Sequence, residues 1–163
     1  MKTKFAIGCL VQWYECDIIE EYVDSLKDAL NQYKGQVIVD FTILGNQDLE
    51  KCISEEQFNK CIKQIKSICN FGNVRYIDKL HTIADYRREF LDKYHSQADV
   101  LIQGESDALM PKQTFTVLDM LHEQVKDSTP KYIATFGINK MWDSSWEPLE
   151  HIEFTDKPFI NDD

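Results

Sequence analysis

Short β-prone runs alternate with stretches in which apolar residues recur every three or four positions, and this alternation limits the possible folds more than any other feature. Such alternation indicates βαβ units, a mainly parallel sheet and helices on both of its faces. We therefore expect an α/β fold, a three-layer αβα sandwich. The expected strands are residues 4–11, 36–44, 74–78, 100–102 and 131–136, with a short edge strand at 152–154. The expected helices are residues 18–33, 54–69, 82–94 and 114–125.

Length and composition suit one domain. The chain has 163 residues, of which 43% are hydrophobic, and this is enough for one sizeable core. No linker, internal repeat or low-complexity tract divides it. We therefore expect a single α/β domain over residues 1–163.

Net charge, hydropathy and cysteine usage argue against nucleic-acid binding and a membrane span, and they indicate a cellular location. A net charge of −10 disfavours binding to a nucleic-acid backbone, so we expect no direct nucleic-acid binding. No apolar run approaches the ~20 residues of a membrane helix, so we expect no membrane span. The 5 cysteines are odd in number and form no Cys-x-x-Cys, which indicates free thiols in a reducing compartment and a cytoplasmic location.

Local signals predict where helices begin and which side they bury. Asp17 with Glu20, and Ser54 with Gln57, have the spacing of capping boxes, which close the first turn of a helix. The helix at 82–94 is expected to place its apolar side chains roughly on one side, together with one arginine: Ile83, Arg87, Phe90 and Leu91.

Residues 99–111 carry the clearest chemical signal. An apolar run at 100–102 predicts a buried strand, Gly104 interrupts it, and two carboxylates follow at Glu105 and Asp107. If the strand persisted, these side chains would share one face with Cα atoms roughly 7 Å apart. Carboxylates at the carboxyl edge of a parallel sheet suit Mn²⁺ or Mg²⁺ bound together with a phosphate. The alternative is a solvated acidic pair, with Asp107 capping the following turn.

Two common nucleotide-binding motifs are missing from the sequence. Neither a Gly-x-Gly-x-x-Gly nor a P-loop pattern follows the first expected strand. This argues against a dinucleotide-binding dehydrogenase and against a Walker-type ATPase.

The order of elements and three segments resemble the nucleotide-sugar glycosyltransferases of the GT-A fold, in particular glycosyltransferase-like proteins of phage and environmental sequences. Glu105-Ser106-Asp107 stands where that family has its Asp-x-Asp metal motif. Residues 85–89, Asp-Tyr-Arg-Arg-Glu, look like the Arg-bearing segment that precedes the metal strand. Residues 140–147, Lys-Met-Trp-Asp-Ser-Ser-Trp-Glu, resemble a segment of the phage-type members.

The resemblance implies a metal-dependent glycosyltransferase that uses a nucleoside-diphosphate sugar as donor, an unknown acceptor, and Mn²⁺ or Mg²⁺ as cofactor. Asp107 would be the main metal ligand, and Glu105 would contact either the metal or the ribose. Arg87 or Arg88 would face the nucleotide. The other implied contacts are Val11, Gln12 and Trp13 at the nucleobase, Asn46 where the family often has an acidic base-binding residue, and Glu147, Glu150 and His151 as acid-base candidates.

Two further functions stay open beside this one. Members of the family are typically longer, so the chain is expected to be a minimal enzyme, a fragment that lacks the C-terminal half with the acceptor site, or a piece that depends on a partner. A non-catalytic nucleotide- or sugar-binding or scaffold domain of the same fold is the first alternative. The second alternative is a sugar-phosphate nucleotidyltransferase, although the glycine-rich loop usual in that class is not present after the first expected strand.

Overall fold

The computed structural model describes residues 2–45, 54–69, 74–76 and 82–127. In this part of the chain, four parallel strands form one sheet in the order β3-β2-β1-β4. The strands are β1 (Phe5–Gln12), β2 (Val37–Gly45), β3 (Val74–Tyr76) and β4 (Val100–Glu105). The predicted α/β class and parallel sheet are confirmed for these residues. The strands expected at 131–136 and 152–154 lie outside the described residues.

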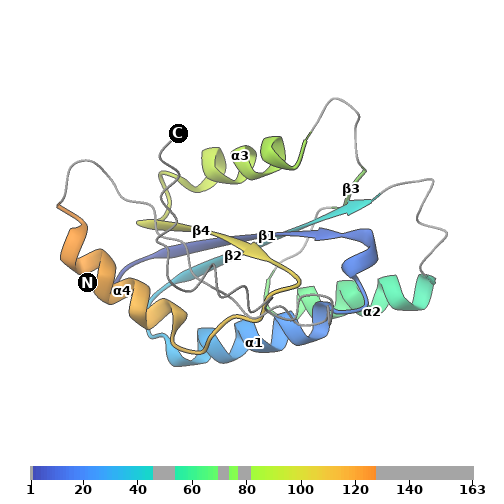
Figure 1. The fold of residues 1–163 in the computed structure, drawn as a ribbon, viewed down its shortest axis with the longest axis horizontal. Coiled ribbons are helices and arrows are strands. Elements are labelled where there is room, and N and C mark those ends of the chain that lie inside the picture. Colours follow the sequence, from blue (N-terminus) through green and yellow to red (C-terminus); the bar gives the residue numbers. More distant parts are fainter. Residues whose placement is uncertain (1, 46–53, 70–73, 77–81, 128–163) are drawn as a thin grey trace, which may run out of the picture.

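Helices lie on both faces of the sheet, as Figure 1 shows. One face carries α3 (Ile83–Tyr94), and the other carries α1 (Ile19–Gln32), α2 (Glu55–Lys66) and α4 (Thr114–Val125). A short 3₁₀ helix, η1 (Trp13–Glu15), follows β1 where the sequence predicts a loop. The expected αβα layering therefore holds for the described part of the chain.

The main core lies between the sheet and α1, α2 and α4. Alternate residues of β1 point into it because successive strand side chains face opposite ways. On the helix side, the core is formed by the predicted apolar stripe of α1 together with residues of α2 and α4. The core residues with at most 1% exposure include Phe5, Ile7, Val11, Ile19, Tyr22, Val23, Leu26, Phe41, Ile43, Cys61, Ile65 and Phe115.

The face under α3 is built differently. A Cβ on Gly8 of β1 would lie 2.6 Å from the ring of Phe90, so the helix packs directly on the strand backbone. Beside it, Asp40 of β2 accepts hydrogen bonds from the Tyr94 hydroxyl at 2.6 Å and from Lys93 Nζ at 3.0 Å. This interface is therefore partly polar.

The predicted apolar side of α3 is wrong in two positions. Ile83 is 46% exposed and Leu91 is 40% exposed, whereas Tyr86 and Tyr94 are buried. Tyrosine fits the partly polar interface because its ring packs on the sheet while its hydroxyl can bond to a polar group such as Asp40.

One predicted helix start is confirmed and one is wrong. Ser54 and Gln57 form the expected capping box of α2. The N-cap of α1 is Ile18, whose side chain makes no capping bond, and Asp17 instead accepts two bonds from Gln57 Nε2 at 2.9 and 3.0 Å. The reason is that η1 leads into α1 through a turn in which Ile18 N donates to the Glu15 carbonyl, so the helix has no open start at Asp17.

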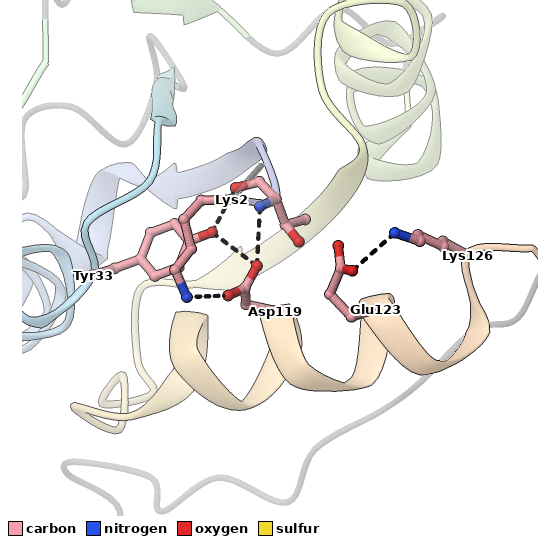
Figure 2. A network of polar contacts seen from close by, with 6 residues as sticks. Lys2, Tyr33, Asp119, Glu123 and Lys126 are labelled. Atoms are coloured by element: carbon pink, nitrogen blue, oxygen red, sulfur yellow. Dashed lines mark hydrogen bonds and ion pairs between the residues drawn. The ribbon is translucent and has the colours of Figure 1, made fainter.

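A buried carboxylate joins the start of the chain to α4, as Figure 2 shows. Oδ1 of Asp119 accepts from the Thr3 backbone N–H at 2.9 Å and lies 3.2 Å from the Tyr33 hydroxyl, and Oδ2 accepts from Lys2 Nζ at 2.7 Å. Burial by itself raises the pKa of Asp119, but the hydrogen bonds from Lys2 and Thr3 outweigh it and lower the pKa. The charged form of Asp119 therefore stabilises the folded chain.

Replacing Asp119 by alanine should destabilise the protein by about 2 to 4 kcal/mol, because it leaves a buried backbone N–H without its acceptor. Asp119→Asn should cost less, since one amide oxygen can still accept at the position of Oδ1. Glu123→Ala is the control, since among the described residues this side chain of the same helix forms an exposed ion pair with Lys126. Urea denaturation measures all three variants, and equal stability of Asp119→Ala and the wild type would contradict the assignment.

The advantage of the wild type over Asp119→Asn should also depend on pH. Because the pKa of Asp119 is lowered by folding, its contribution is present above the ordinary aspartate value near 4 and is lost as the pH falls below it. Denaturation midpoints of the two proteins should therefore converge in acid. A difference that stays constant from neutral pH into acid would contradict this prediction.

Gly8→Ala should destabilise the protein by about 1 to 3 kcal/mol, because the new methyl group would overlap the ring of Phe90. In a Phe90→Ala background the same change should cost clearly less, since the overlapping ring is gone. The two backgrounds form a double-mutant cycle that isolates this contact. A cost of Gly8→Ala that is equal in both backgrounds would show that α3 does not pack on Gly8.

Candidate functional site

The strand order places a switch point between β1 and β4. The chain runs from β1 to β2 to β3 and then returns through α3 to β4 on the other side of β1. The two strands are parallel, and Leu10 of β1 pairs with Glu105 of β4, so both end at the same edge. In open α/β sheets, ligands bind outside the carboxyl ends of the strands at such a point.

The segment after β1 presents aromatic side chains at this edge. Trp13 is half-buried and Tyr14 is 54% exposed, and their rings lie edge to face with centroids 5.4 Å apart. Gln12 is also half-buried, whereas Val11 is fully buried in the core. Of the predicted nucleobase contacts, Gln12 and Trp13 can use their side chains, and Val11 can offer only its backbone.

At the end of β4, the glycine that follows the apolar run does not end the strand. The strand continues through Gly104 to Glu105. A Cβ on Gly104 would lie 2.4 Å from the hydroxyl of Tyr22, so glycine is needed there for helix packing and not to end the strand. Ser106 and Asp107 lie in a turn, in which Ala108 N donates to the Glu105 carbonyl at 3.2 Å. The two carboxylates therefore do not alternate along one strand.

The structure distinguishes the two candidate arginines. Arg87 of α3 forms an ion pair with Glu105 at the end of β4, with both side chains close to half exposed. Arg88 pairs with Asp85 on its own helix at 2.9 Å, and its side chain is 67% exposed. Arg87 is therefore part of the switch-point edge, and Arg88 belongs to the surface of α3.

Glu15 is a residue of this site that the sequence analysis missed. Its Oε2 accepts from the Gln12 backbone N–H at 2.7 Å and from the Ser106 hydroxyl at 2.6 Å. Burial raises the pKa of Glu15, the two hydrogen bonds oppose that shift, and the nearby charges of Asp107 and Glu105 add to it. The Gln-x-x-Glu spacing of residues 12–15 is a signal for the bond between Glu15 and the Gln12 backbone N–H. Nothing in the sequence indicates the contact of Glu15 with Ser106.

The carboxylates of this edge fit a cation held by few protein ligands. Within residues 2–45, 54–69, 74–76 and 82–127, no group of three or more His, Cys, Asp or Glu side chains is arranged to hold a metal ion. Glu105 and Asp107 supply the hard oxygen ligands that Mg²⁺ and Mn²⁺ prefer, and such ions often take only one or two carboxylates beside water and phosphate. The donor types are those of a Mg²⁺ or Mn²⁺ site, but in this structure the Glu105 carboxylate is paired with Arg87.

The remaining predicted site residues lie outside the described residues. They are Asn46, Glu147, Glu150 and His151.

A small cavity with a mixed polar and apolar lining lies between α3 and the sheet. Its volume is about 50 Å³, and its polar lining includes Asp40, Thr42, Arg87, Lys93 and Gln103. This space has room for only a few water molecules and is far smaller than the roughly 300 Å³ or more of a typical ligand pocket. This cavity is therefore too small to enclose a nucleotide.

Comparisons with protein-family models, with curated proteins and with solved structures found no significant match to this chain.

Among the helices of the described residues, none has the length and apolar character required to cross a lipid bilayer.

Proposed function

We propose that the protein binds a nucleoside-diphosphate sugar at the carboxyl edge of β1 and β4 and transfers its glycosyl group in a metal-dependent reaction. The observation that carries the proposal is the set of side chains at the switch point. Glu105 ends β4 and Asp107 follows it, Arg87 reaches Glu105 from α3, and Trp13 lies after β1. The family resemblance of the sequence points to the same chemistry.

Different side chains of the site would contact different parts of the ligand. Asp107 and Glu105 would hold the cation, which neutralises charge on the diphosphate leaving group when it is bound. When Glu105 turns to the cation, the guanidinium of Arg87 becomes available to a phosphate oxygen, since Arg87 and Glu105 are already neighbours. The ring of Trp13 offers an apolar surface for the base.

Transfer requires one bond to break and one to form. The bond between the anomeric carbon and the diphosphate oxygen breaks, and the nucleoside diphosphate leaves with the electron pair. An acceptor hydroxyl forms the new bond to the anomeric carbon and gives its proton to a base. Glu147, Glu150 and His151 are the proposed candidates for that base.

The first test is calorimetric titration of UDP and GDP with and without Mn²⁺. We expect the wild type to bind one of them only with Mn²⁺, and Asp107→Asn to weaken that binding at least about tenfold, roughly 1.4 kcal/mol. Asp24→Asn is the matched control, because it removes the same charge from an exposed ion pair with Lys27 within α1.

The outcomes separate the candidate functions. Metal-independent binding, or no binding of either nucleotide, would contradict the proposed site. Metal-dependent binding by a protein that transfers no sugar in an acceptor screen would favour a non-catalytic binding domain of the same fold.

A second test compares the two arginines. Arg87→Gln should weaken metal-dependent nucleotide binding about tenfold or more, because a charge-assisted hydrogen bond contributes about 1.5 to 3 kcal/mol. Arg88→Gln should change affinity less than about twofold, since Arg88 pairs with Asp85 on the surface of α3. Equal effects of the two changes in the same titration would place the nucleotide away from Arg87.

A further inference from the structure

We infer that Glu15 is a positioning residue that holds the segment Glu105-Ser106-Asp107 in place for ligand binding. The inference rests on the proposed function, in which this segment carries the cation ligands. Glu15 belongs to η1 after β1, and the segment follows β4, so the contact joins the two sides of the switch point.

The contact is direct and mostly shielded from water. The Ser106 hydroxyl donates to Glu15 Oε2 at 2.6 Å, and Ser106 is only 1% exposed. Ser106 lies between Glu105 and Asp107, so its bond restrains the backbone that presents both carboxylates. A second bond, from Met110 N to the Ser25 hydroxyl at 2.9 Å, fixes the chain beyond the turn to α1. The turn is therefore held at both of its ends.

One carboxylate oxygen of Glu15 accepts both hydrogen bonds described for this side chain. Oε2 bonds to the Gln12 backbone N–H and to Ser106, so both lone pairs of that atom are used. An amide oxygen can accept the same two bonds without a charge. Glu15→Gln should therefore keep the segment in place, whereas Glu15→Ala should release it, and this difference separates positioning from a role of the charge itself.

Hydrogen exchange tests the positioning without any ligand. The amide of Ala108 closes the turn by donating to the Glu105 carbonyl, so its exchange reports the order of the segment. We expect residues 105–110 to exchange at least about fivefold faster in Glu15→Ala and in Ser106→Ala, with Glu15→Gln close to the wild type. Global unfolding midpoints of the variants identify any change that comes from lost stability. Unchanged exchange of this segment in both alanine variants would overturn the inference.

Titration of Mn²⁺ with UDP or GDP tests the consequence for binding. We expect Glu15→Ala and Ser106→Ala to weaken metal-dependent nucleotide binding at least about tenfold, and Glu15→Gln to stay within about threefold of the wild type. Glu20→Gln is the control for charge, because this nearby carboxylate pairs with Lys60 at 2.6 Å on the surface of α1. Affinity lost equally in Glu15→Gln and Glu15→Ala would overturn the positioning role in favour of a charged ligand.

Failure of this inference can be told apart from failure of the proposed function. A wild type that binds the nucleotides with Mn²⁺ while Glu15→Ala binds them equally well would refute the role of Glu15 alone. A wild type that binds neither nucleotide would refute the proposed function, and the exchange experiment would still decide whether Glu15 orders the segment.

Discussion

The burial of β1 on both faces is the constraint on which the rest of the structure depends. This strand has neighbours on both edges, β2 and β4, and its residues from Phe5 to Cys9 are buried. Apolar side chains of β1 point toward α1, and the ring of Phe90 from α3 packs against the backbone at Gly8. Since all three layers meet on this strand, the loops at its carboxyl end are held on a rigid support.

The two faces of the sheet differ in how they hold their helices. α1, α2 and α4 enclose an apolar core, and the hydrogen bonds of Asp119 lie at the edge of this core. α3 instead lies over a small cavity of mixed lining and is fixed in part by hydrogen bonds to Asp40 and by the ion pair of Arg87 with Glu105. The helix with the more polar attachment is thus the one that contacts the proposed ligand site.

The candidate site is assembled from segments that are distant in the sequence. Glu15 and Ser106 are separated by 91 positions and meet because β1 and β4 are neighbours in the sheet. The sequence analysis found Glu105, Asp107 and Arg87 from their spacing and from a family resemblance. It missed Glu15, because the residue resembles an ordinary acidic position in a polar loop until the strand order is known.

The sequence by itself determined the class of fold and the positions of most helices and strands. Hydrophobic period and capping signals are local, so Ser54 with Gln57 and the apolar stripe of α1 could be read directly. Tertiary structure decided which arginine reaches the site, which side of α3 is buried, and why position 104 is glycine. It also gave Asp17 another role, because that side chain bonds to Gln57 of α2. Each of these outcomes depends on a partner that is remote in the chain, and no local pattern of residue types specifies such a partner.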